Sequence, residues 1–194
     1  MAVNTGKEGK KFEQAIKEAA DKKGYYFLRL PDSNKFGQQG TQTRFTQQSP
    51  FDALMFDGCI LYCLELKHTD GNSLSFPNPV DTKPPKGKTF MIKYHQIQNL
   101  LEGAKHPNVV AGLLIDFGDR YSSKGKLLDE ASCWFVHINN FYEWAKNTDK
   151  KSINRDDVKS LGYKVTKTKK KVNYSYDISD LTDIFLSYDI VEAF

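Results

Sequence analysis

The sequence lacks long hydrophobic runs and is poor in cysteine, with three in 194 residues. No apolar stretch reaches the roughly 18 residues that a membrane span requires. The first residues, MAVNTGKEGKK, lack the apolar core of a signal peptide. We therefore expect a cytoplasmic protein without membrane contact. Cys59, Cys63 and Cys133 are odd in number and lack metal-ligand spacing, so we expect reduced thiols.

The chain has enough apolar material for one folded domain. Its length predicts a single domain over 1–194, and its 39% hydrophobic residues, with 13 Phe and 10 Tyr, suffice for a core. The net charge of +4 is weak evidence for a polyanionic partner. The lysines, however, crowd two segments: Lys83, Lys86, Lys88 and Lys93 in one, and Lys164, Lys167, Lys169, Lys170 and Lys171 in the other. Such segments are typical either of phosphate contacts or of solvated strand edges.

The order of helical and strand patterns predicts an α/β fold, a mixed central β-sheet flanked by helices. Helices are expected over 5–23, 92–104, 154–161 and the tail 178–194, with a further helix through Phe141 capped by Asn139 or Asn140. Strands are expected over 25–30, 109–117 and 133–138, with a Lys-rich hairpin or extended segment over 163–176. The polar segment 32–50 predicts a loop that projects between the first two strands.

Asp57-Gly58 lies between two apolar runs, which predicts a hairpin of strands 51–56 and 59–67. Because side chains alternate along a strand, Glu65 and Lys67 share one face. The antiparallel return brings Asp52 close to Glu65, with a small bulge to reconcile the residue counts on the two sides of the turn. We interpret Asp57 as a turn residue.

Two carboxylates on adjacent strands can hold a hard divalent cation, most plausibly Mg²⁺. Lys67 can then orient or deprotonate a water and offset charge on a phosphate. Glu13 is a candidate third carboxylate, and Gln96 a candidate holder of the attacking water or a phosphate oxygen. The alternatives are a surface salt bridge for the strand residues and a solvated side chain for Glu13. For His95 and Asp116 we expect structural roles.

Asp52 followed by Glu65-Leu66-Lys67 resembles the PD-(D/E)xK nuclease signature. The chain is similar to the RecU family of Holliday junction resolvases in several further stretches: Gly9 to Glu13, Phe76, His95-Gln96, 112–117 and 151–154. The resemblance implies a restriction-endonuclease-like core and a homodimeric, Mg²⁺-dependent endonuclease, with Mn²⁺ as a substitute. Its substrate would be the four-way DNA junction, nicked symmetrically on two strands, and 32–50 would be the stalk that enters the junction. The resemblance also suggests that the protein acts in a bacterial cell, or in one infected by a phage of a Gram-positive host.

The chain departs from the family where Phe51 replaces the usual small polar residue before Asp52. The alternatives are therefore a restriction-like or repair nuclease with another DNA substrate, or an inactive DNA-binding protein. In each case the candidate phosphate contacts are the cations of the loop and the two basic segments: Lys35, Arg44, Lys83, Lys86, Lys88, Lys164, Lys167, Lys169, Lys170 and Lys171. The alternative for Lys35 and Arg44 is a flexible polar loop without DNA contact.

Overall fold

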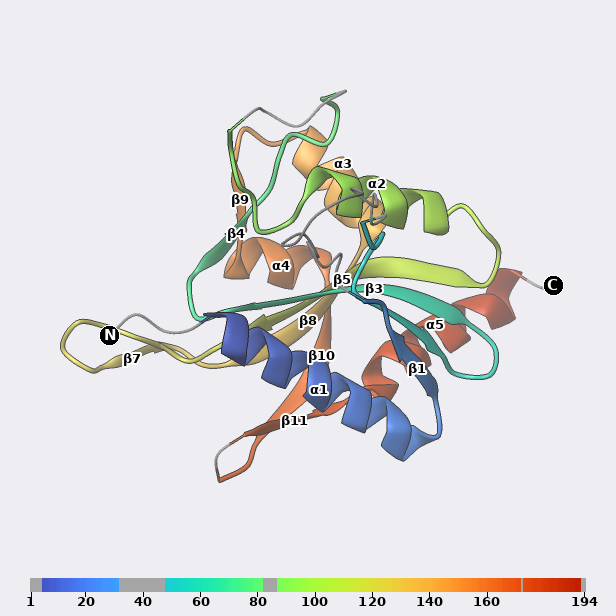
Figure 1. Ribbon diagram of the computed structural model, residues 1–194, viewed down its shortest axis with the longest axis horizontal. Coiled ribbons are helices and arrows are strands. Elements are labelled where there is room, and N and C mark those ends of the chain that lie inside the picture. Colours follow the sequence, from blue (N-terminus) through green and yellow to red (C-terminus); the bar gives the residue numbers. More distant parts are fainter. Residues whose placement is uncertain (1–4, 32–47, 82–86, 172, 193–194) are drawn as a thin grey trace, which may run out of the picture.

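The computed structural model describes residues 5–31, 48–81, 87–171 and 173–192 of the chain (Figure 1). Its centre is a seven-stranded sheet of order β1-β2-β3-β5-β8-β10-β11. Its strands are β1 (Tyr26–Arg29), β2 (Ala53–Phe56), β3 (Leu61–Thr69), β5 (Val109–Phe117), β8 (Ser132–His137), β10 (Tyr163–Lys169) and β11 (Tyr174–Asp177). The pairing of β3 with β5 is parallel and the other pairings are antiparallel, so the predicted mixed sheet is confirmed.

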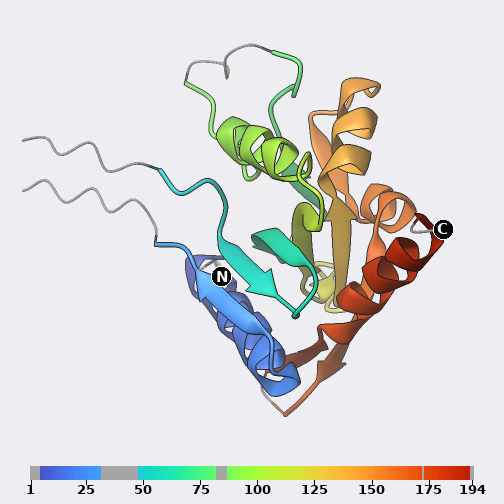
Figure 2. The same cartoon turned by 90° about the vertical axis from the view of Figure 1, so that its right-hand side faces the viewer.

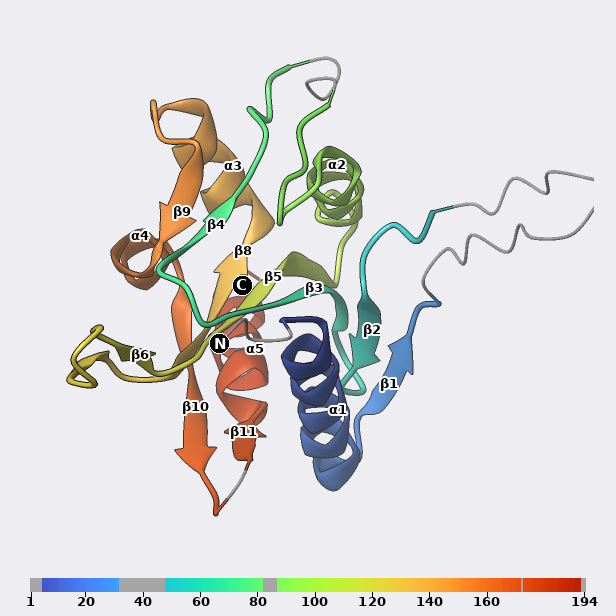
Figure 3. The ribbon, with the colours of Figure 1, turned by 60° about the vertical axis from the view of Figure 1, so that its left-hand side comes forward.

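Helices cover both faces of this sheet, as Figures 2 and 3 show. One face carries α1 (Thr5–Lys23) and α5 (Ser179–Glu192), and the other carries α2 (Tyr94–Gly103), α3 (Ile138–Lys146) and α4 (Arg155–Leu161). Each layer has its own apolar core, and β5 contributes side chains to both. This explains the unbroken apolar run over 109–117, because a central strand is shielded from water on both sides. The predicted α/β fold is confirmed.

Four short strands form two additional ribbons, which the sequence patterns did not predict. They are β4 (Ser73–Ser75) paired with β9 (Ser152–Asn154), and β6 (Arg120–Tyr121) paired with β7 (Leu127–Asp129). Strands of two or three residues are too short for a period-two pattern to be recognised. The end of β3 and all of β4 lie in the stretch between the predicted hairpin and the predicted helix over 92–104, where no strand was expected.

The predicted ends of two helices differ in outcome. Gly24 ends α1 in the left-handed conformation with φ of 75°, as its position predicts. The predicted cap of α3 was wrong, because the helix begins earlier, at Ile138. His137 precedes it and its Nδ1 accepts a hydrogen bond from Asn139 N at 3.2 Å.

The β2–β3 hairpin has a longer turn than we predicted. Asp57 Oδ1 accepts hydrogen bonds from the backbone N–H groups of Cys59 and Ile60, both at 2.8 Å, so β3 begins only at Leu61. Asp57 is thus the turn residue, as predicted. The strands then pair regularly from Phe56 opposite Leu61 onward. The predicted bulge was wrong, because the longer turn already takes up the extra residues.

The predicted projecting loop at 32–50 lies outside the described residues except for its last three. Its described borders are adjacent, since Ser49 Oγ donates a hydrogen bond to the Pro31 carbonyl and Leu30 N donates to the Asp52 carbonyl at 2.8 Å. None of the described helices is long and apolar enough to cross a membrane.

Candidate active site

The hairpin register brings Asp52 beside Glu65. Ala53 pairs with Leu64, so the residue before Ala53 lies opposite the residue after Leu64. Asp52 N donates to the Leu64 carbonyl at 3.1 Å, and Asp52 Oδ2 accepts a hydrogen bond from Leu66 N at 2.9 Å. The backbone of β3 therefore holds the Asp52 side chain in place.

Glu65 is fully buried, with 0% of its surface exposed. Its Oε1 accepts hydrogen bonds from Lys67 Nζ and from Gln96 Nε2, whereas its Oε2 has no hydrogen-bond partner within the described residues. Burial raises the pKa of Glu65 to about 8, Lys67 opposes this shift, and the negative charge of Asp52 adds to it. A buried carboxylate oxygen without a partner, next to a second carboxylate, is costly unless a cation or a proton joins it.

Lys67 lies one strand period after Glu65, on the same face, as predicted. Its side chain is 17% exposed and its ammonium forms an ion pair with Glu65. The ammonium is therefore held at the carboxylate while part of the side chain still reaches solvent.

Gln96 lies in the first turn of α2, and protein partners occupy both ends of its amide. Oε1 accepts a hydrogen bond from Lys93 N at 2.8 Å, and Nε2 donates to Glu65. The amide thus connects the start of α2 to the Glu65 carboxylate. In this arrangement Gln96 orients Glu65, whereas its predicted contact with a water or a phosphate oxygen stays a prediction.

The residues present suit a hard divalent cation. Asp52 and Glu65 supply carboxylate oxygens, which Mg²⁺ prefers, and Glu65 Oε2 needs a partner. Nowhere in the described parts of the chain do three or more His, Cys, Asp or Glu side chains form a metal-binding group. Among the described residues, Asp52 and Glu65 are therefore the side chains that would hold such a cation.

Glu13 is not grouped with these carboxylates. Helix α1 packs on the face of β3 that carries Leu64 and Leu66, whereas the Glu65 side chain points to α2 on the other face. Glu13 instead forms an ion pair with Arg29 of β1. Its metal-binding role stays a prediction that this arrangement does not favour.

His95 is close to the site, although the sequence suggested only a structural role for it. Burial lowers the pKa of His95, and the positive charges of Lys93 and Lys67 lower it further. A neutral imidazole beside Lys67 follows from this. The sequence signal for its placement is its position directly before Gln96 on the first turn of the helix.

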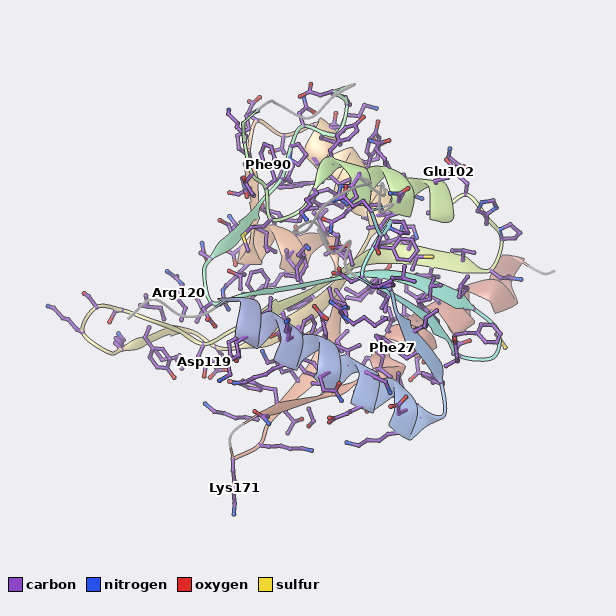
Figure 4. The ribbon with its side chains drawn as sticks, viewed as in Figure 1. Phe27, Phe90, Glu102, Asp119, Arg120 and Lys171 are labelled. Atoms are coloured by element: carbon purple, nitrogen blue, oxygen red, sulfur yellow. The ribbon has the colours of Figure 1, made fainter. Side chains whose placement is uncertain are left out.

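The predicted phosphate contacts differ in accessibility. Exposed lysines of the β10–β11 hairpin and the segment before α2 are Lys164, Lys169, Lys170, Lys171 and Lys88. Lys171 extends away from the body of the protein, whereas Asp119 lies nearer to it (Figure 4). For Lys167, phosphate contact stays a prediction that the structure does not favour, because its side chain is 3% exposed and its ammonium pairs with Asp116 at 2.6 Å. Outside the described residues lie Lys35, Arg44, Lys83 and Lys86.

Comparison with known proteins found similarities both in sequence and among solved structures. No family model matches the chain. The chain is 28% identical, over 192 residues, to the SPbeta prophage-derived uncharacterized protein YotM of Bacillus subtilis strain 168. The matched region covers 92% of this chain and 87% of YotM. Among solved structures it is similar to Hjc, a Holliday junction resolvase of Archaeoglobus fulgidus, with a TM-score of 0.45 and 15% identity over 79% of this chain and 93% of that one.

Proposed function

We propose that this chain is a single nuclease domain that cleaves four-way DNA junctions by metal-dependent phosphodiester hydrolysis. We further propose that it acts as a homodimer, because paired symmetric nicks on a two-fold symmetric substrate call for two sites. The observation that carries the proposal is the buried Glu65 carboxylate on β3. It accepts hydrogen bonds from Lys67 and Gln96 and lies beside the Asp52 carboxylate.

Each side chain of this site has a separate role in the proposed hydrolysis. Asp52 and Glu65 would hold the cation, and Gln96 keeps the Glu65 carboxylate in one orientation. Lys67 presents its ammonium where negative charge develops on the phosphate oxygens in the transition state. Cation binding requires the ionised carboxylate, so Glu65 gives up the proton that burial otherwise favours. When bound, Mg²⁺ supplies Lewis-acid polarisation and lowers the pKa of a coordinated water.

The choice of a branched substrate rests on the residues that the chain shares with the RecU family. Among the described residues, Pro31 and Ser49 meet near the start of β2, where Asp52 lies. The resemblance to the RecU family, in which the corresponding loop is a basic stalk, supports the same substrate. The similarity to a prophage-derived protein supports a phage setting, with action on DNA in the bacterial cytoplasm.

Cleavage of labelled DNA tests the substrate. We expect purified protein with Mg²⁺ to nick a mobile four-way junction symmetrically, and to cut linear duplex, flap and single-stranded DNA far more slowly. Equal rates on duplex and junction would instead indicate a restriction-like or repair nuclease. Junction binding without any cleavage would indicate a DNA-binding protein. Sedimentation with and without the junction tests the homodimer.

A further inference from the structure

A second group of ionisable side chains lies on the opposite face of the sheet from Glu65. His68 follows Lys67 on β3, so its side chain points toward α1 rather than α2. There it lines a cavity of about 580 Å³ between α1 and the β10–β11 hairpin, together with Asp70 and Asp116. The proposed hydrolysis uses none of these three residues.

The His68 imidazole is hydrogen-bonded on one side, and on the other it faces Asp70 without a hydrogen bond. Its Nδ1 hydrogen-bonds Asp116 Oδ2 at 2.7 Å, and its side chain is 8% exposed. Asp116 Oδ1 in turn accepts from Lys167 Nζ at 2.6 Å and from the Tyr176 hydroxyl at 3.0 Å. His68 Nε2 has no hydrogen-bond partner within the described residues. A buried polar atom without a hydrogen bond is destabilising, so a ligand at Nε2 would relieve this penalty.

Asp70 stands at the distance from Nε2 that a shared metal ion requires. Its Oδ1 lies 3.4 Å from His68 Nε2. Two ligands of a tetrahedral ion, with bonds of 2.0–2.2 Å, are roughly 3.3–3.6 Å apart. The Asp70 carboxylate packs against Gly118, where a Cβ atom would overlap it. The absence of a side chain at Gly118 therefore allows Asp70 to come this close.

We propose that His68 Nε2 and Asp70 Oδ1 bind a divalent cation of the zinc class, with water from the cavity at the remaining positions. Asp116 orients the imidazole as carboxylates do behind metal-bound histidines. Lys167 offsets the charge of Asp116, which leaves Asp70 as the anionic ligand. A nitrogen ligand suits Zn²⁺, Co²⁺ or Ni²⁺ better than Mg²⁺, so this site differs in selectivity from the Asp52 and Glu65 carboxylates.

Titration of the full chain with Co²⁺, followed by its visible absorption, tests the site. We expect one Co²⁺ ion with intense tetrahedral bands, which Zn²⁺ displaces and millimolar Mg²⁺ does not. Asp70→Asn and His68→Gln should each weaken binding by about 10-fold or more. His106→Gln, at an exposed histidine outside both sites, should leave binding unchanged.

Two results would overturn the proposal. One is the absence of Co²⁺ bands in the wild-type protein, and the other is undiminished binding in Asp70→Asn. Asp70 is 37% exposed, so its substitution leaves the buried His68–Asp116 pair intact and tests the site even where His68→Gln does not fold. Because the readout is metal absorption rather than cleavage, the outcome does not depend on the proposed nuclease activity.

Discussion

Among single residues, Glu65 carries the largest electrostatic cost in the proposed active site. Its folded-state pKa of about 8 lies above the ordinary value, so the folded state binds a proton that the unfolded state releases. The stability from this proton is complete below about pH 4.5, and it is lost as the pH rises toward 8.

We predict that Glu65→Gln stabilises the cation-free protein at pH 8, because the neutral amide need not ionise. The gain in unfolding free energy relative to wild type should grow from pH 4.5 to 8 and level off above, reaching on the order of 1–4 kcal/mol. Urea denaturation in EDTA measures it. Glu102→Gln, at an exposed helix position, is the control and should show no such growth. Parallel profiles for Glu65→Gln and wild type would contradict the account.

A second prediction concerns Gln96, which we infer to orient Glu65. Gln96→Ala should lower kcat by about 10–100-fold with little change in KM or junction affinity, since the amide contacts the carboxylate rather than the DNA. Gln98→Ala, on the same helix with its side chain near the Pro79 carbonyl, is the matched control and should retain activity. A rise in KM without a fall in kcat would show that Gln96 binds substrate instead.

For single residues, the sequence was informative where the alternation of side chains along a strand decides which residues share a face. Asp52, Glu65 and Lys67 share a face because the hairpin register and the period of two require it. The sequence was uninformative where a distant segment of the chain supplies the partner of a buried charged side chain. The burial of Lys167 depends on Asp116, which is 51 residues away, and no local pattern marks a lysine for burial.

Among the elements, β5 depends on close packing against β8. A Cβ atom at Gly112 would overlap the Val136 carbonyl oxygen and lie 2.6 Å from the Phe135 ring. We predict that Gly112→Ala lowers the unfolding free energy by about 2–4 kcal/mol, because neither backbone nor buried ring can yield easily. Gly9→Ala, in the interior of α1 with open space around it, is the control and should be neutral or stabilising. Thermal unfolding measures both, and an equal effect of the two substitutions would contradict the described packing.

Long elements were predictable, whereas the strands of two or three residues were not. The helix over 5–23 and the strand over 109–117 have periodic or continuous apolar patterns, and the structure confirms both ranges. The turn after Asp57 is longer than the Asp-Gly pair suggested, because the Asp57 side chain accepts hydrogen bonds from the backbone N–H groups of Cys59 and Ile60. Such a choice between turns depends on local hydrogen bonds that composition does not reveal.

For the whole molecule, the exposed lysines of the β10–β11 hairpin should contribute to DNA affinity without sequence preference. We predict that the triple substitution Lys164→Gln, Lys170→Gln and Lys171→Gln weakens junction binding. It should also reduce the slope of log affinity against log salt by up to about 3, near 0.9 per lost phosphate contact. Titrations by fluorescence anisotropy at several salt concentrations measure this slope.

The matched control removes three lysines that already pair with neighbouring acids, by Lys105→Gln, Lys146→Gln and Lys159→Gln. This variant changes the net charge equally but should leave the slope near its wild-type value. Equal losses in both variants would mean that net charge, and not the hairpin, attracts the DNA. The clustering of lysines was visible in the sequence, but which of them remain free depended on the fold.

The most direct test of the proposed active site is Mg²⁺-dependent cleavage of a labelled four-way junction by wild-type protein and by Asp52→Asn. We predict symmetric nicks with wild type, a loss of at least about 100-fold in rate with Asp52→Asn, and unchanged junction binding. Asp57→Asn, the same substitution at the turn of the same hairpin, should keep its activity. Undiminished cleavage by Asp52→Asn, or no cleavage by the wild-type protein, would contradict this prediction.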